Sequence, residues 1–334
     1  MASKDLLIVS GAQPTGPMHV GNWAGSLRNW VELQNQHPER CMFFIADYHS
    51  MTIDYDPKEK QHQILDLAAT ILALGIDSRK STLFVQSDVP EHTELAWIFN
   101  CVTPVVEMER MTQYKDKTAH HAKNINMGLL DYPVLQAADI LLYLGNAVPV
   151  GQDQVQHVET TRVIARNFNK RFGAVFPEPK ALLTETPKVM SLTDPTKKMS
   201  KSHGEKSLIA LDDEPDVILK KMKAVPTEPT GIVTDAALKT EAFAGVALLL
   251  DLIELCEGKA ARKAALAESP VKYGDLKKRA ADAVAGKFAD FRAKKKELLK
   301  NPDRIRLVLA SGGAKARAHA KQTMETVLKV TGLR

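Results

Sequence analysis

Short unbroken apolar runs and longer amphipathic stretches alternate along roughly the first 200 residues of the chain. Residues 6–10, 41–46 and 82–86 are apolar at nearly every position, which is typical of strands buried on both faces of a parallel sheet. The clearest amphipathic stretch covers residues 57–74, and Gly75 supplies its C-terminal stop. This alternation predicts an α/β fold with a Rossmann-type doubly wound parallel sheet, in which ligands bind at the carboxyl ends of the strands.

Beyond about residue 210 the strand patterns give way to helical ones. Ala, Lys, Leu and Glu dominate three stretches, and three prolines punctuate the passage toward them. The stretches are residues 260–266, 275–300 and 312–330, and the prolines are Pro215, Pro226 and Pro229. We therefore expect two domains, a Rossmann-type domain over residues 1–208 and a helical domain over residues 209–334.

The composition is that of a folded globular protein. Hydrophobic residues make up 44% of the 334 residues and charged residues 25%. The longest apolar stretch, residues 247–256, contains two acidic residues and falls far short of the roughly 20 residues that span a bilayer, so we expect no membrane association. The N-terminus lacks the pattern of a signal peptide, and Cys41, Cys101 and Cys256 form no C-x-x-C pair. These features predict a cytoplasmic protein without a disulfide framework or a zinc site.

Charge is distributed unevenly along the chain. Residues 258–334 hold 20 Lys and Arg against 7 Asp and Glu, a net charge of +13, so the remaining residues carry −8 of the overall +5. Such asymmetry fits a C-terminal part that faces a polyanion such as a nucleic acid. A set of solvated, lysine-rich helix faces explains the charge equally well, and both interpretations stay open at this point.

A glycine-rich turn follows the first predicted strand. Residues 11–22 run from that strand into an amphipathic stretch, and this order of elements is a common setting for phosphate groups. Gly11 and Gly21 allow close approach of a ligand, while His19 and Asn22 offer hydrogen-bond donors. The turn matches neither G-x-G-x-x-G nor a Walker A motif, which disfavours NAD and P-loop chemistry. A purely structural turn is the alternative.

A second polar cluster lies at residues 194–202. Lys198 and Lys201 stand among Ser, Thr and Pro without apolar periodicity, which predicts a mobile basic loop rather than a packed helix. Such a loop can close on a pyrophosphate group. An isolated basic loop is, however, more often a solvated surface.

Taken together and in this order, the two clusters resemble the signatures of class I aminoacyl-tRNA synthetases. His19-Val-Gly-Asn22 resembles the first signature, and Lys198-Met-Ser-Lys-Ser202 matches the second in full. Further runs are similar to bacterial tryptophanyl-tRNA synthetases. They are residues 10–16, 137–143, 150–157, 190–198 and 313–320.

The resemblance implies a two-step reaction, in which ATP activates L-tryptophan to an adenylate with release of pyrophosphate and the aminoacyl group then passes to tRNA(Trp). It implies ATP contacts at Gln13, Pro14, Thr15, Gly21, Asn22, Gly151, Gln152, Asp153, Val189, Lys198, Met199, Ser200, Lys201 and Ser202. The residues implied in catalysis are His19, Asn22, Lys117, Lys198 and Lys201. Mg²⁺ is expected to sit mainly on the ATP phosphates, with no metal site of the protein's own.

The same resemblance implies a tryptophan pocket around Asp139. An acceptor-only carboxylate suits the indole N–H, which is a donor only. The other implied pocket positions are Gln113, His49, Gln136, Val148 and Val9. Gln136 replaces the Met usual in these relatives and is closer to the Gln of tyrosyl-tRNA synthetases, while Val9 replaces an aromatic residue.

The resemblance also implies partners. It predicts a homodimer whose interface helices are inserted at about residues 89–144, and a tRNA anticodon-binding role for residues 209–334. Two alternatives stay open, a tyrosyl-tRNA synthetase and a catalytically inactive tRNA-binding paralogue.

Overall fold

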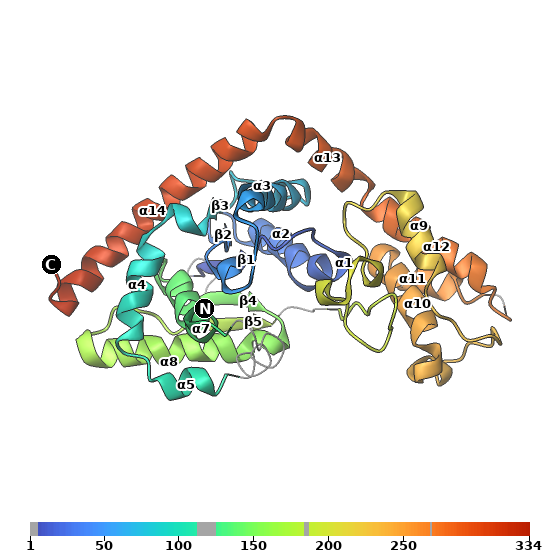
Figure 1. Ribbon diagram of the computed structural model, residues 1–334, viewed down its shortest axis with the longest axis horizontal. Coiled ribbons are helices and arrows are strands. Elements are labelled where there is room, and N and C mark those ends of the chain that lie inside the picture. Colours follow the sequence, from blue (N-terminus) through green and yellow to red (C-terminus); the bar gives the residue numbers. More distant parts are fainter. Residues whose placement is uncertain (1–5, 112–124, 184–186, 268) are drawn as a thin grey trace. The chain divides into compact units, whose positions relative to one another are not determined.

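The computed structural model describes residues 6–111, 125–183, 187–267 and 269–334, apart from the side chain of Asp153 (Figure 1). Contacts divide the chain into two compact units. The sheet unit comprises Met1–Gly16, Asn29–Thr184 and Leu298–Arg334, and the helical unit comprises Pro17–Arg28 and Glu185–Glu297.

The sheet unit contains a five-stranded, wholly parallel sheet, which confirms the predicted fold class. Its order is β3-β2-β1-β4-β5, so the chain reverses its direction of winding between β1 and β4. The strands are β1 (Ile8–Ala12), β2 (Cys41–Ile45), β3 (Thr82–Val85), β4 (Ala147–Val150) and β5 (Lys180–Leu183). The three predicted apolar runs correspond to β1, β2 and β3.

Helices cover both faces of this sheet. The two neighbours Phe43 and Phe44 on β2 point to opposite faces. The ring of Phe43 stacks on that of Trp30 in α2, with 4.5 Å between the ring centroids. Phe44 instead belongs to a core formed with residues of α4, α7, α8 and α14. The helices of this unit are α2 (Arg28–Gln36), α3 (Pro57–Ala73), α4 (Glu91–Asn100), α5 (Val105–Glu109), α7 (Met127–Leu141), α8 (Val155–Phe172) and α14 (Pro302–Thr331). The first residue of α2, Arg28, is assigned to the helical unit.

Local sequence signals account for α3, as predicted. Asp56 precedes the helix and its carboxylate accepts the N–H of Lys58, while Pro57 occupies the first helical position, where its missing N–H costs nothing. Gly75 follows the last turn with a φ of +117°, a conformation that glycine adopts without strain.

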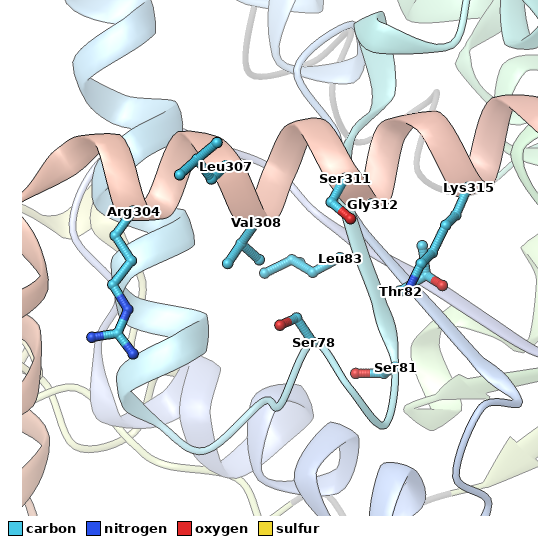
Figure 2. A pocket seen from close by; sticks show the side chains of 10 residues that line it. All are labelled: Ser78, Ser81, Thr82, Leu83, Arg304, Leu307, Val308, Ser311, Gly312 and Lys315. Atoms are coloured by element: carbon cyan, nitrogen blue, oxygen red, sulfur yellow. The ribbon is translucent and has the colours of Figure 1, made fainter.

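The C-terminal helix α14 packs on the edge strand β3. A Cβ atom added at Gly312 would overlap the carbonyl oxygen of Leu83, so only glycine permits this approach (Figure 2). The helix thereby covers a strand edge that would otherwise present unpaired backbone groups. α14 was predicted as part of the C-terminal helical domain, yet it packs within the sheet unit.

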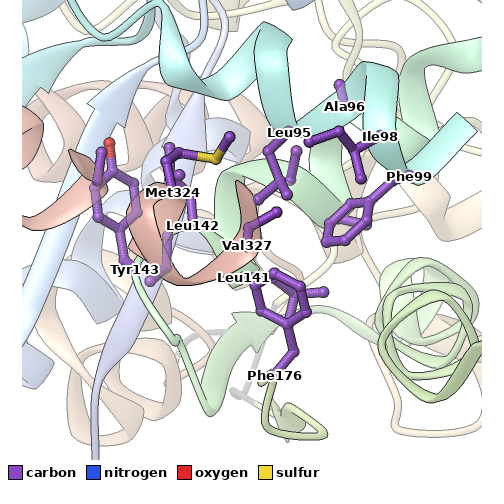
Figure 3. Close-up of a cluster of buried hydrophobic side chains, with 14 of the residues drawn as sticks. Leu95, Ala96, Ile98, Phe99, Leu141, Leu142, Tyr143, Phe176, Met324 and Val327 are labelled. Atoms are coloured by element: carbon purple, nitrogen blue, oxygen red, sulfur yellow. The ribbon is translucent and has the colours of Figure 1, made fainter. Parts of the chain in front are cut away.

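The main apolar core of the sheet unit joins segments far apart in sequence (Figure 3). Leu95 and Phe99 of α4 meet Leu141 at the end of α7 and Val327 of α14, all of them buried. Burial of such side chains contributes about 1.5–3 kcal/mol each, so this core binds the last helix firmly to the first half of the chain.

The helical unit combines two separate segments of the chain. Its named helices are α1 (Val20–Asn22), a π-helical turn (Trp23–Leu27), α9 (Pro215–Lys223), α10 (Ala244–Glu257), α11 (Lys259–Ala264), α12 (Tyr273–Lys287) and α13 (Ala289–Lys300, which ends three residues beyond the unit). Backbone hydrogen bonds from Val20 N–H to Ile209 and from Leu211 N–H to Met18 join the two segments. The helices predicted after residue 210 are present, whereas the proposed functional boundary at 208/209 stays a prediction. The compact units are divided at other positions along the chain than this predicted boundary.

Candidate functional site

Two candidate ATP segments lie where the winding of the sheet reverses. Gln13, Pro14 and Thr15 follow the carboxyl end of β1, and Gly151 and Gln152 follow that of its neighbour β4. Gln13 and Gln152 are exposed, while Pro14 is buried. In doubly wound sheets, ligands bind at such a reversal point. This arrangement brings together segments almost 140 residues apart in the sequence. Asp153 follows Gln152, and its side chain lies outside the described atoms.

His19 and Asn22 cap the short helix α1 reciprocally. The Nδ1 atom of His19 accepts the backbone N–H of Asn22 at 3.3 Å, and the Oδ1 atom of Asn22 accepts the backbone N–H of His19 at 3.1 Å. Because Nδ1 is an acceptor here, the hydrogen of the neutral ring lies on Nε2. The cap uses only the Oδ1 atom of the Asn22 side chain, so its NH₂ group takes no part in the cap.

The electrostatic surroundings keep His19 uncharged. Burial, followed by the charges of Lys201 and Lys198, lowers the pKa of His19 to about 4. A neutral His19 is a hydrogen-bond donor at neutral pH, and the two lysines supply the positive charge. All three residues belong to the helical unit.

The second signature forms a hairpin rather than an open loop. Met190 and Lys198 form an isolated antiparallel bridge, and the N–H of Met199 donates to the carbonyl of Val189 at 2.9 Å. Met199 is buried and lies 3.8 Å from the position of a Cβ on Gly21. Lys198, the residue before Met199, is exposed. The bridge to Met190 therefore fixes the backbone from which the basic side chain of Lys198 extends.

A short turn completes the second signature. The hydroxyl group of Ser200 accepts the N–H of Ser202 at 3.4 Å, which starts a 3-10 turn at Lys201. Ser202 is exposed and Lys201 half-buried. The turn lies on the same unit as His19 and Asn22, so both signatures belong to one compact body.

Asp139 lies at the centre of a buried polar network in the sheet unit. Its side chain is on α7 and has no exposed surface. Oδ2 accepts from Nε2 of His49, and Oδ1 accepts from Nε2 of Gln86 and from Nδ1 of His92, each at 2.7 Å. Burial works to raise the pKa of Asp139, but the charge of His49 and the bonds of both histidines outweigh it, so the pKa falls to about 2.

The network continues from His92 to the hydroxyl group of Tyr143. Nε2 of His92 lies 2.7 Å from that oxygen, and both side chains are fully buried. Burial, followed by the charges of Asp139 and Glu91, raises the pKa of Tyr143, so its hydroxyl group keeps its hydrogen. The ring of Tyr143 makes an edge contact with His319 of α14.

The other predicted pocket residues have different positions. Val9 on β1 and Val148 on β4 are buried, and Gln136 is half-buried one helical turn before Asp139. Gln113 and Lys117 lie outside the described residues. Of the predicted set, the structure joins His49 directly to Asp139.

Sequence reasoning missed Gln86, His92 and Tyr143. Gln86 directly follows β3, and a polar residue at the carboxyl end of a buried parallel strand is a usable signal for a site. His92 offers no comparable local signal, because its partner is 47 positions away.

A separate pocket of about 270 Å³ lies between α14 and the start of β3 (Figure 2). Arg304 and Lys315 contribute cations to its wall, while Ser78, Thr82 and Ser311 contribute hydroxyl groups. It contains none of the predicted site residues and lies at the amino end of β3. It is therefore distinct from the reversal point at the carboxyl ends of the strands.

The described residues contain no group of three or more His, Cys, Asp and Glu side chains that could hold a metal ion. None of the helices in the described part of the chain has the length and apolar character needed to cross a membrane.

Comparison with known proteins decides the family. The model of the class I tRNA synthetases (W and Y) matches residues 1–289. The chain belongs to this family. The resemblance seen in the two signatures is thereby confirmed.

Solved structures agree with this assignment. The tryptophanyl-tRNA synthetase from Campylobacter jejuni, in complex with ADP and tryptophan, is 33% identical with a TM-score of 0.85, over 98% of this chain and 100% of that one. The enzyme from Mycoplasma pneumoniae is 31% identical with a TM-score of 0.84, over 98% of each chain. A tyrosyl-tRNA synthetase from Aeropyrum pernix is 16% identical with a TM-score of 0.67, over 93% and 90%, which shows the fold alone.

Proposed function

We propose that this chain is a tryptophan–tRNA ligase. It activates L-tryptophan with ATP to tryptophanyl-adenylate, releases pyrophosphate, and transfers the aminoacyl group to tRNA(Trp) with release of AMP. The observation that carries the choice of amino acid is the similarity of this chain, at more than 30% identity over nearly its whole length, to solved tryptophanyl-tRNA synthetases. Asp139, an ionised, fully buried acceptor on α7, suits the indole N–H. ATP–pyrophosphate exchange measured with each of the 20 amino acids tests the proposal, with tryptophan expected as the preferred substrate.

Positioning and charge neutralisation are the chain's contribution to the first step. The tryptophan carboxylate attacks the α-phosphorus, so the protein has to orient both groups and stabilise charge on the departing phosphates. The segments after β1 and β4 would hold the nucleotide, His19 would donate from Nε2, and Lys198 and Lys201 would face the phosphates. Lys117 is kept as a phosphate ligand in this proposal. Mg²⁺ would be carried by the ATP phosphates and would neutralise part of their charge.

A tyrosyl-tRNA synthetase is the second candidate, and Gln136 is the residue that favours it. A Tyr hydroxyl group can donate to Asp139 as an indole N–H does, and Gln136 offers a second partner. The solved structures from Campylobacter jejuni and Mycoplasma pneumoniae, both above 30% identity, are tryptophanyl enzymes, which favours tryptophan. Exchange that is faster with tyrosine would reverse the order of the two candidates, and no exchange with any amino acid would favour an inactive paralogue.

We further propose a homodimer, with residues 89–144 at its interface. Exposed large apolar side chains support this surface, since they rarely gather on a free monomer. Those among the described residues of this range are Trp97, Val105, Val106, Ile125, Met127 and Leu144, with Trp97 70% exposed. Sedimentation velocity tests the proposal, and Trp97→Asp is expected to shift the protein toward the monomer.

The remaining partner is tRNA, with the basic residues of the C-terminal part as its contact. Residues 209–334 keep the proposed anticodon-binding role, which binding of an anticodon-stem RNA would test. The predicted cytoplasmic location accompanies this function, since its substrates are ATP and a tRNA.

A further inference from the structure

The two carboxylate oxygens of Asp139 accept different numbers of hydrogen bonds. Each oxygen of an ionised carboxylate can accept two hydrogen bonds. Oδ1 already accepts two, from Gln86 and from His92. Oδ2 accepts one, from His49, among the described residues. With the described residues as its partners, this carboxylate therefore keeps a single acceptor position, and it belongs to Oδ2.

The two donors to Oδ1 have fixed orientations. Gln86 uses its Oε1 atom to accept the backbone N–H of Tyr48 at 3.1 Å, so its NH₂ group must face Asp139. His92 must carry a hydrogen on Nδ1 to bond an acceptor-only carboxylate, which leaves Nε2 of the neutral ring to accept from Tyr143. Neither donor can turn away without breaking a second hydrogen bond.

Exposure distinguishes the two sides of the carboxylate as well. Gln86, His92 and Tyr143 have no exposed surface, whereas the His49 side chain retains 8%. His49 is therefore the partner of Asp139 closest to solvent. A ligand that approaches from solvent meets Oδ2 on the His49 side and cannot reach Oδ1 without dismantling the buried side.

We propose that Oδ2 of Asp139 receives the substrate N–H beside His49, and that His92, held by Tyr143, is a positioning residue that keeps Oδ1 occupied and the carboxylate correctly turned. Gln86 has the same positioning role from the end of β3. His49 is the partner that adjusts when the substrate enters. This inference rests on the proposed activation of tryptophan.

The test compares L-tryptophan with its benzothiophene analogue, in which sulfur replaces the indole N–H. The readout is the ratio of kcat/KM for the two compounds in ATP–pyrophosphate exchange by the full-length protein. In the unaltered protein the ratio is expected between about 5 and 150, because the analogue leaves a buried acceptor unsatisfied. His92→Leu should lower that ratio by about 3- to 10-fold, since one donor to the carboxylate is lost. His92→Asn should keep the ratio within about twofold, because its amide nitrogen can occupy the place of Nδ1.

His157 provides a matched control. It is also buried, and its Nε2 atom lies 2.8 Å from the hydroxyl group of Tyr132, but it is not among the described hydrogen-bond partners of Asp139. His157→Leu should therefore leave the ratio unchanged even if it lowers stability. Tyr143→Phe, which keeps the ring and removes only the hydroxyl group, should lower the ratio in the same direction as His92→Leu and serves if that variant fails to fold.

The outcomes separate the positioning role from the proposed function. Equal losses with both compounds in His92→Leu, or an unchanged ratio in both His92→Leu and Tyr143→Phe, would overturn the positioning role. Absence of tryptophan-dependent exchange in the unaltered protein would instead overturn the proposed function.

Discussion

At the scale of single residues, charge and hydrogen bonding determine which groups can act. His19 is neutral because burial and two neighbouring lysines oppose its protonation. Asp139 is ionised because its partners outweigh its burial. The candidate phosphate and tryptophan sites thus use opposite electrostatic conditions, a neutral donor in one and an anionic acceptor in the other.

The pKa of His19 leads to the first prediction. Binding of ATP brings negative charge toward Lys198 and Lys201 and should raise the pKa of His19 above its value of about 4. Histidine NMR titration with and without ATP measures the change. A pKa at or above 6.5 in the free protein would contradict this electrostatic account.

The same group makes stability depend on pH. The pKa of His19 is lower in the folded protein than the usual 6.5, so its contribution is complete above pH 6.5 and is lost as the pH falls toward about 4. His19→Asn keeps a capping oxygen and removes the titration. Denaturant unfolding should therefore show a weaker pH dependence for His19→Asn than for the unaltered protein between pH 4 and 6.5. Identical curves would mean that His19 contributes nothing there.

Lys198 and Lys201 carry the second prediction. Replacing either by Ala should slow adenylate formation by about 10²- to 10³-fold, as loss of one preorganised positive donor does, with a smaller effect on tryptophan binding. Rapid-quench measurement of the first turnover tests this. Lys197 is the control, because it lies in the same hairpin but pairs with Asp194 at 3.0 Å. Losses for Lys198→Ala and Lys201→Ala no larger than for Lys197→Ala would remove both lysines from the mechanism.

At the scale of elements, α14 connects the end of the chain to the sheet. It covers the edge of β3 through Gly312, adds Val327 to the core, and brings Arg317 to the buried Glu91 at 3.1 Å. Arg317 therefore has a structural partner, although charge alone suggests a free cation on the basic tail. Its replacement would leave Glu91 buried without this partner.

Gly312 leads to the third prediction. Ala at this position places a methyl group against the backbone of β3 and should lower the free energy of unfolding by about 1–3 kcal/mol or more. Gly286 of α12 is the control, because its added Cβ would meet no atom within 4 Å apart from the neighbouring backbone of its own helix. Gly286→Ala should be neutral or stabilise by up to about 1 kcal/mol. Similar effects at both positions, measured by denaturant unfolding, would contradict the close packing of α14.

At the scale of the whole molecule, the cations of the basic C-terminal segment differ in whether they have an acidic partner. Arg306, Arg317 and Arg334 of the C-terminal segment pair with Asp303, Glu91 and Glu94. Arg304 and Lys315 have no acidic partner among the described residues, and both line the pocket beside β3. Unpaired cations are the better candidates for phosphate contacts, because they give up no existing ion pair.

This difference leads to the fourth prediction. Replacing Arg304 and Lys315 together by Ala should raise the tRNA concentration needed for aminoacylation and lower the slope of log affinity against log salt by about 1.4. Exchange without tRNA should stay nearly unchanged. Arg317→Ala should mainly lower stability, which distinguishes a structural cation from one that binds RNA. An unchanged salt slope in the double variant would exclude this surface as a tRNA contact.

Several features of this protein are local and were predictable from the sequence by itself. Continuous apolar runs mark β1, β2 and β3 because a strand covered on both faces needs apolar side chains at every position. Pro57 and Gly75 bound α3 because their backbone preferences act within a single turn. The two signatures indicated the family because binding of the ATP phosphates depends on short, contiguous motifs.

The tertiary structure decided which distant residues meet. Gln86 and His92 reach Asp139 because parallel strands and the helices after them converge at one edge of the sheet, and no local pattern records that convergence. Likewise, only long-range backbone hydrogen bonds show that Pro17–Arg28 belongs with Glu185–Glu297, and only packing shows that α14 belongs with the sheet. Periodicity reports whether a side chain is buried, whereas topology determines against which partner it is buried.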